Sequence, residues 1–342
     1  MRQTLTQTPT RTRFWIVAFA AAGLLLALTG CQSAGTGSSS DPFQASSYDS
    51  EYTIGATKSD GSPIASNANT GFNNPAGIAV HGSNFYVADS SNDRIQKFGL
   101  DGNFATNWTT GSNTEPKGAA VGNSATVYAA YFASNSIEGY TPAGGNATSP
   151  SGTSDTDSFE RIAVGDNYIY VADSANHRIL RYDFSLTSTH TLGDTTTGWD
   201  SGVLIQSAGD GDGEFDDPTG VAVDTQRGYL YVADRKNHRI QKFDLAGNFV
   251  TKWGQNGTAV ADFVYPSGVA VDPNGNVYVA DAGNNRIQKF DSTGNYITDF
   301  GSHGSGQGEL IDPVDVALDS EGNVYVTENV VNHRVQKFSP VQ

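Results

Sequence analysis

The chain has 342 residues, of which 36 are acidic and 20 are Lys or Arg, so its formal net charge is −16. A surface of this sign repels phosphate backbones, which argues against nucleic acid as a partner. A single cysteine, Cys31, excludes an intrachain disulfide and a cysteine-based zinc finger, so packing alone has to stabilise the fold.

Residues 1–30 predict a signal peptide. Three arginines precede an apolar run at residues 14–28, which is short for a membrane span. The run leads into Leu28-Thr29-Gly30-Cys31, which resembles the lipobox of bacterial lipoproteins. That resemblance implies a lipid on Cys31 that holds the protein to a membrane at the cell envelope, the outer membrane if the cell is Gram-negative. An uncleaved anchor and an ordinary core thiol are the alternatives.

Residues 31–50 are rich in Ser and Gly and show no apolar periodicity, which predicts a flexible tether. Residues 51–342 consist of six similar units, each with short apolar stretches separated by Gly-rich turns. Repetition of such a unit predicts the radial arrangement of one small sheet. The units open at Pro75, Pro116, Phe159, Pro218, Pro266 and Pro313.

The fourth unit shows the pattern most clearly. It predicts strands at residues 221–223, 229–233, 239–243 and 248–253, with Gly220 allowing backbones to approach closely near a central axis. Its Pro-Thr-Gly-Val-Ala-Val, Tyr-Val-Ala-Asp and Asn-His-Arg-Ile-Gln-Lys-Phe stretches resemble NHL repeats, and the resemblance covers the whole repeat region. It implies an all-β fold, a six-bladed β-propeller.

The sixth unit ends four residues after Phe338, before a fourth strand can form. Near the other end of the chain, Tyr52–Gly55 looks like a copy of the missing strand. We therefore predict that an N-terminal strand completes the last blade and closes the ring, because closure removes the exposed sheet edges that invite aggregation.

Some charged and imidazole side chains recur at equivalent places in the units. Recurrence predicts structural roles, because a catalytic site needs one copy of each group. The acid–arginine pairs are Asp89/Arg94, Asp173/Arg178, Asp234/Arg239, Asp281/Arg286 and Glu328/Arg334, and the histidines are His177, His238 and His333.

Residues that break the repeat near the axis are the candidates for a ligand site. Just after the opening residue, most units carry small side chains, whereas Lys117, Glu160, Arg161 and Asp315 are charged. These four charges either bind a polar ligand or neutralise one another. Lengthened or altered loops on a rigid scaffold often carry recognition. We therefore predict three exposed aromatic residues on a partner surface, namely Tyr131, Phe132 and Trp199.

The stretch from Gly209 to Asp217 alternates glycine with acids and predicts a Ca²⁺ loop through Asp210, Asp212 and Asp217. It lacks the ligand spacing of an EF-hand. A related stretch before the sixth unit has fewer acids, so the glycines alone are explained by a turn between blades. Ca²⁺ is the one cofactor that the residue types suggest.

Two functions stay open. The first is a non-enzymatic binding module, a monomeric, lipid-anchored propeller whose loop face meets a protein, peptide or glycan. The resemblance favours this function, since NHL propellers in general look like interaction platforms. The alternative is a metal-dependent enzyme, lactonase-like or lyase-like, with Glu160 and Asp315 as ligands or base in the central channel. The positions at which NHL-related amidating lyases hold zinc carry no histidine here, and no GxSxG or HExxH pattern occurs.

Overall fold

The computed structural model describes residues 41–57, 63–64, 71–112, 114–145, 151–152, 158–186, 189–192 and 208–341. The predicted signal peptide, Cys31 and Trp199 lie outside the described residues. The described residues from Phe43 to Val341 belong to one folded unit. Within the described ranges, no helix is long and apolar enough to cross a membrane.

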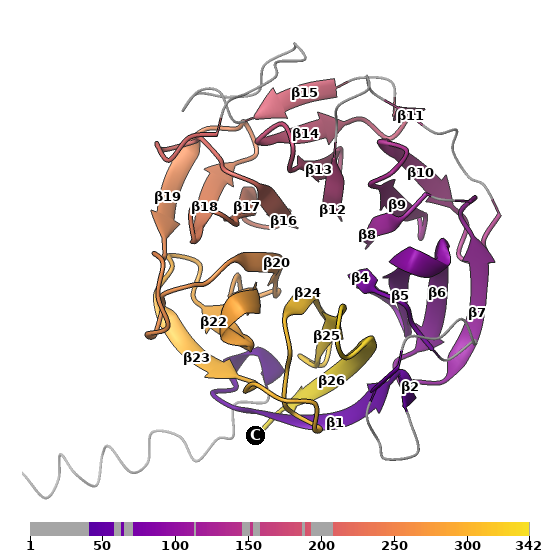
Figure 1. Ribbon diagram of the computed structural model, residues 1–342. Helices are drawn as coiled ribbons and strands as arrows, with labels where there is room; N and C mark the ends of the chain where they lie inside the picture. Colours follow the sequence, from indigo (N-terminus) through magenta and orange to yellow (C-terminus); the bar gives the residue numbers. More distant parts are fainter. Residues whose placement is uncertain are drawn as a thin grey trace, which may run out of the picture. The chain divides into compact units, whose positions relative to one another are not determined.

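Six four-stranded antiparallel sheets are arranged as blades around a central axis (Figure 1). The innermost strand of each blade contacts the innermost strand of the next, and the sixth contacts the first, so the blades form a ring. The all-β, six-bladed propeller predicted from the repeats is confirmed. The innermost strands are β4 (Pro75–His81), β8 (Pro116–Val121), β12 (Phe159–Val164), β16 (Pro218–Asp224), β20 (Pro266–Val271) and β24 (Pro313–Leu318).

The remaining strands follow in chain order from the axis outward. Blade 1 continues with β5 (Asn84–Asp89), β6 (Arg94–Gly99) and β7 (Phe104–Thr109), and blade 2 with β9 (Val127–Tyr131), β10 (Ser136–Tyr140) and β11 (Ser151–Gly152). Blade 3 continues with β13 (Ile169–Asp173), β14 (Arg178–Tyr182) and β15 (Thr189–Leu192), and blade 4 with β17 (Tyr229–Asp234), β18 (Arg239–Asp244) and β19 (Phe249–Trp253). Blade 5 continues with β21 (Val277–Asp281), β22 (Arg286–Phe290) and β23 (Tyr296–Phe300), and blade 6 with β25 (Val324–Glu328) and β26 (Arg334–Pro340).

The outermost strand of blade 6 comes from the other end of the chain. Strand β1 (Tyr48–Ile54) pairs antiparallel with β26, with Tyr52 opposite Lys337 and Ile54 opposite Val335. The two ends of the folded unit are thus joined in one sheet (Figure 1). A short hairpin of β2 (Ala56–Thr57) and β3 (Pro63–Ile64) follows β1.

The folded unit begins before residue 51, the boundary drawn from composition. A 3₁₀ turn, η1 (Pro42–Gln44), places Phe43 in a buried position. The Lys289 ammonium donates to the carbonyl oxygens of Phe43 at 2.8 Å and Ala45 at 3.0 Å. The end of the predicted tether is therefore fixed against blade 5 by hydrogen bonds that its Ser-rich composition did not indicate.

Blade packing follows from strands that are apolar on both faces. The second strand of blade 5, Val277–Asp281, is buried throughout because each face packs on a neighbouring blade. Close approach near the axis requires glycine at Gly220, where a Cβ would lie 2.1 Å from the carbonyl oxygen of Ser267 in the next blade. The prediction of a crowding glycine at this position is confirmed.

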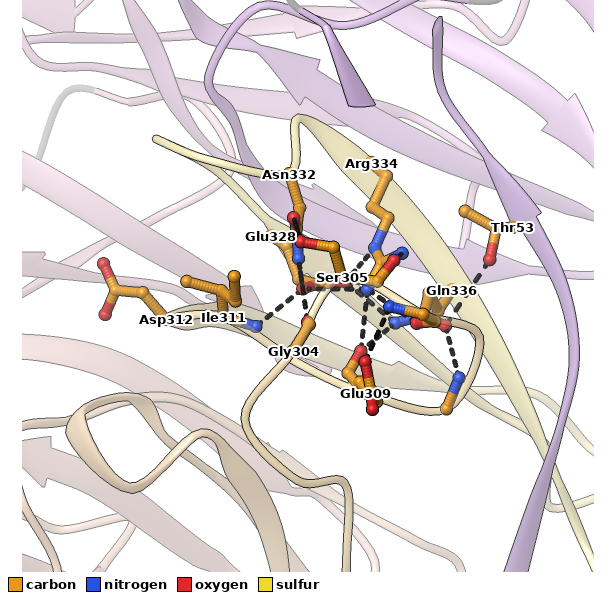
Figure 2. A network of polar contacts seen from close by, with 12 residues as sticks. Thr53, Gly304, Ser305, Glu309, Ile311, Asp312, Glu328, Asn332, Arg334 and Gln336 are labelled. Atoms are coloured by element: carbon orange, nitrogen blue, oxygen red, sulfur yellow. Dashed lines mark hydrogen bonds and ion pairs between the residues drawn. The ribbon is translucent and has the colours of Figure 1, made fainter. Parts of the chain in front are cut away.

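The recurring acid–arginine pairs fix the turn between the second and third strands. All five form ion pairs at 2.5–2.9 Å, with the carboxylate fully buried. In blade 6, Glu328 also accepts from the amide of Ile311 and the side chains of Asn332 and Gln336, as Figure 2 shows. Arg334 reaches three main-chain carbonyls of the preceding loop. A buried polar network with its partners in place is rigid, and it fixes these turns at one end of the ring.

A second recurring contact joins neighbouring blades. The Nδ1 atoms of His177, His238 and His333 each accept, at 3.1 Å, the N–H of the residue before the proline that opens the next blade. Asn285 and Asp93 make the equivalent contact at two further junctions. We call these contacts the inter-blade bonds, and they confirm the structural role predicted for the histidines.

Candidate binding site

A cavity of about 580 Å³ opens at one end of the axis, and we call it the mouth. Its walls are formed by residues just after the opening residue of each unit and by the turns between second and third strands. The first group contains Ala76, Lys117, Glu160, Arg161, Thr219, Ser267 and Val314, and the second contains Phe132, Ser174, Ala175, His177, Arg235, Lys236, Ala282 and Asn329. Asp217, Asp312 and Pro313 complete much of the remaining wall.

The opposite end of the channel is different in character. Its shallow opening, about 210 Å³, is lined by Val, Ala, Ile and Leu side chains contributed equally by all six innermost strands. An apolar ring of this regularity follows directly from the repeat. The mouth is the end at which the blades differ from one another, as a selective site requires.

Arg161 connects three blades across the floor of the mouth. It takes the place of a glycine present in four other units, and only 4% of it is exposed. Its Nη1 donates to the carbonyl oxygen of Lys117 at 3.0 Å and its Nη2 to that of Val314 at 3.4 Å. Its Nε lies 3.6 Å from Oδ2 of Asp315. A blade 3 side chain therefore contacts both blade 2 and blade 6.

Asp315 is buried below the mouth. Its carboxylate accepts the N–H of Ile78 at 3.0 Å and that of Val316 at 3.0 Å. Burial raises the pKa of Asp315 to about 6, although the neighbouring Arg161 guanidinium lowers it. Glu160 also pairs with Arg161, at 3.2 Å. Three of the four predicted charges are therefore engaged with one another, as the ion-pair interpretation expects.

Lys117 is the exception among these four. It lines the mouth, and among the described residues its ammonium forms no ion pair with a carboxylate. Its Nζ lies 5.6 Å from the centre of the Phe132 ring, and 36% of Phe132 is exposed. The mouth therefore presents a cation next to an exposed aromatic ring, both of which were predicted from the sequence as candidates.

Tyr131 does not belong to an exposed surface, so that prediction is wrong. The side chain is completely buried, and its hydroxyl shares a hydrogen bond of 2.6 Å with the hydroxyl of Tyr140. Tyr140 in turn donates to Glu138. Tyr131 occupies the place of the recurring aspartate, and this phenol pair replaces the acid–arginine pair inside blade 2.

The three aspartates predicted for Ca²⁺ do not gather around one point. The carboxylate of Asp212 pairs with Lys252 at 2.8 Å, and that of Asp217 pairs with Arg235 at 3.0 Å. Asp210 contributes its carbonyl oxygen to Arg239. The carboxylates of Asp212 and Asp217 thus face different basic side chains, and the described ranges contain no group of three acidic, His or Cys side chains placed to hold a metal ion.

Two cationic residues of the mouth were not predicted from the sequence. Arg235 and Lys236 occupy the second turn of blade 4, where blade 3 has Ser174 and Ala175. A comparison of the residues at equivalent positions of these turns would have identified the two cationic residues from the sequence. Arg235 pairs with Asp217 and lies over the Tyr265 ring at 5.0 Å.

These features define the protein as a six-bladed β-propeller with one differentiated mouth. The chain carries NHL repeats. Four segments match the NHL repeat family, residues 72–98, 215–243, 263–290 and 310–338, which are the inner three strands of blades 1, 4, 5 and 6. Blades 2 and 3, which supply Lys117, Phe132 and Arg161, fall outside these matches.

Curated relatives match over short stretches. Protein brain tumor of Drosophila melanogaster is 44% identical over 63 residues, which is 18% of this chain and 6% of that protein. Protein lin-41 of Caenorhabditis elegans is 57% identical over 44 residues, which is 13% of this chain and 4% of that protein. The chain thus spans a small fraction of the length of these relatives.

Solved structures match over most of the chain at low identity. A structural genomics protein of unknown function from Bacteroides thetaiotaomicron VPI-5482 has a TM-score of 0.64 at 18% identity, covering 86% of this chain and 76% of that one. A streptogramin B lyase has a TM-score of 0.56 at 12% identity, covering 85% and 98%. A gluconolactonase from Xanthomonas campestris has a TM-score of 0.53 at 15% identity, covering 78% and 86%. These similarities show the fold alone.

Proposed function

We propose that this protein is a non-enzymatic binding module that accepts a protein, peptide or glycan at the mouth. The observation that supports this proposal is the contrast between the two ends of the channel. One end has three aliphatic residues from every blade, whereas the mouth combines four cationic side chains with an exposed aromatic ring. Loops on a rigid ring are suited to recognition because the scaffold fixes their relative positions.

The enzymatic alternative has less support in the geometry. It requires Asp315 as a metal ligand or base, but this carboxylate is buried against Arg161 and two main-chain amides. The fold similarity to a lyase and a lactonase carries no residue of either site to this chain, because identity is only 12–15%. We therefore retain binding as the proposal.

We also propose that Cys31 carries a lipid and that the propeller acts at the cell envelope as a monomer. The lipobox-like Leu28–Cys31 stretch supports this proposal. Metabolic labelling with an alkyne fatty acid should mark the full chain and fail to mark Cys31→Ser. Equal labelling of both chains would contradict the anchor without affecting the mouth.

Site-specific photo-crosslinking tests the binding face. A photoreactive residue at Ala175, exposed at the mouth, is compared with one at Glu321, exposed in a turn at the other end of blade 6. We expect a discrete crosslinked species from envelope extract at Ala175 and none at Glu321. The same species at both positions, or at Glu321 alone, would contradict binding at the mouth.

A further inference from the structure

We propose that the mouth recognises a peptide carboxylate that lies next to an apolar residue, through Lys117 and Phe132. This inference rests on the proposed binding function and specifies the chemistry of its ligand. It begins from the balance of charges in the mouth. Lys117, Arg161, Arg235 and Lys236 line the cavity together with three carboxylates, those of Glu160, Asp217 and Asp312.

The native carboxylates are already oriented toward other cations. Glu160 pairs with Arg161 at 3.2 Å, and Asp217 pairs with Arg235 at 3.0 Å. Burial raises the pKa of Asp312, and the charge of Arg235 lowers it. Lys117 is left as the cation of the mouth with no paired carboxylate among the described residues. A ligand carboxylate supplies the missing partner.

Arg161 supports the main chain that carries Lys117. Its Nη1 donates to the carbonyl oxygen of Lys117 at 3.0 Å and to Glu160 at 3.2 Å, and its Nε faces the carboxylate of Asp315 at 3.6 Å. The guanidinium is therefore engaged at the floor of the mouth, with 4% of the residue exposed. The donor left for a ligand carboxylate is the Lys117 ammonium.

Apolar side chains are exposed in two of the turns at this end of the ring. Phe132 projects from blade 2, and Val330 and Val331 project from blade 6 with 64% and 52% exposed. The two valines follow Asn329, which lines the mouth, in a turn one residue longer than the equivalent turns. A cavity of about 580 Å³ has the size of a small-ligand pocket. It accommodates a few residues of peptide, so we infer an acidic group flanked by an apolar side chain.

The strongly acidic chain restricts this ligand to few charges. A net charge of −16 repels a polyanion at long range, whereas one carboxylate gains more from the local cations than it loses. Both a chain-terminal carboxylate and the side chain of Asp or Glu have the required chemistry. The experiment distinguishes these two sources.

Fluorescence polarisation with four labelled tetrapeptides tests the inference on the purified full chain. Two peptides, Gly-Gly-Phe-Asp-amide and Gly-Gly-Phe-Asn-amide, differ in a side-chain carboxylate. Two others, Gly-Gly-Gly-Phe with a free or an amidated terminus, differ in a terminal carboxylate. We expect at least one carboxylate peptide to bind about tenfold more tightly than its amide partner, the size of effect that a hydrogen-bonded charge gives.

Lys117→Gln should remove this tenfold preference, whereas Lys252→Gln should keep it, because Lys252 pairs with Asp212 and does not line the mouth. Phe132→Ala should weaken the carboxylate and amide peptides by a similar factor. Equal affinity for carboxylate and amide, no binding of any peptide, or a preference that survives in Lys117→Gln would overturn the inference. If one of these results is found while crosslinking at Ala175 is specific, the carboxylate inference fails and the proposed binding function remains. If specific crosslinking at Ala175 is absent as well, the binding function also fails.

Discussion

The inter-blade bond at His333 makes a sharp prediction about stability. This residue lies at the junction where blade 6 meets blade 1, and its Nδ1 accepts the N–H of Asn74 at 3.1 Å. Its backbone φ is 43°, in the left-handed region, and the equivalent Asn285 has φ 56°. His333→Asn should therefore keep both the acceptor and the backbone conformation, because Asn285 makes the same contact with Asp312 at 3.0 Å.

Replacement of His333 by glycine tolerates the left-handed backbone but removes the acceptor. The N–H of Asn74 then loses its partner at a junction between blades, which costs about 1–3 kcal/mol. His333→Ala should cost roughly 1 kcal/mol more, because a left-handed conformation is unfavourable for alanine. Urea unfolding at pH 7.5 measures the free energy of unfolding of each variant. We expect it to be highest for wild type and His333→Asn, lower for His333→Gly and lowest for His333→Ala.

The matched negative control is Asn135, which occupies the equivalent turn at the junction of blades 2 and 3 with φ 50°. Its Oδ1 is buried and accepts no hydrogen bond from any residue that the structure describes, so Asn135→Gly should cost much less than His333→Gly. If Asn at position 333 is as destabilising as Gly, or if both glycine variants lose equal stability, the inter-blade bond is not what His333 contributes.

The bond also has a defined pH dependence. Burial lowers the pKa of His333 below its usual 6.5, because the protonated ring is disfavoured and Nδ1 must stay free to accept. The stabilisation from this residue is therefore complete above pH 6.5 and declines as the pH falls from there toward the folded-state pKa. The variant His333→Asn should lack this part of the decline.

Three further predictions concern the blades and the axis. Asp234→Ala leaves the guanidinium of Arg239 buried without its carboxylate and should cost about 3–5 kcal/mol in urea unfolding, whereas a loss below 1 kcal/mol would refute its role in fixing the turn. Gly220→Ala places a Cβ 2.1 Å from the carbonyl oxygen of Ser267 and should lower the melting temperature by a shift equivalent to about 1–3 kcal/mol. An unchanged melting temperature would mean that the neighbouring inner strands can move apart at no cost in stability. Burial raises the pKa of Asp315 to about 6 from a usual 3.8, so its contribution to stability is greatest at low pH and falls as the pH rises between these values. Asp315→Asn should abolish that fall in a pH series of thermal unfolding. If the series is unaltered, the fall in stability belongs to other groups.

The sequence contained enough to predict the blades. The opening proline, the apolar second strand, the aspartate that ends it and the arginine after the turn recur in most units. These residues contact their own blade or the adjacent one, so residues that are close in the sequence are also close in the structure. The ion pairs Asp89/Arg94 and Asp234/Arg239 were predictable for this reason.

Substitutions within the pattern were harder to interpret. Tyr131 stands where other units have aspartate, and sequence alone could not show that Tyr140 provides a buried phenol to pair with it. Asp212 and Asp217 are near in sequence, but their carboxylates face Lys252 and Arg235, which belong to other strands and turns. The direction of a side chain depends on partners that a local pattern does not specify.

By itself, the sequence determined a six-bladed ring, four of whose blades match NHL repeats, and the positions at which its blades differ. Only the tertiary structure decided what those differences become, because the axis brings together six segments that are far apart along the chain. There Arg161 of blade 3 meets Asp315 of blade 6, while Lys117 has no carboxylate partner among the described residues. Residues that are close in the sequence form each blade through short-range hydrogen bonds and packing. The charge balance of the mouth, in contrast, exists only once the ring has formed.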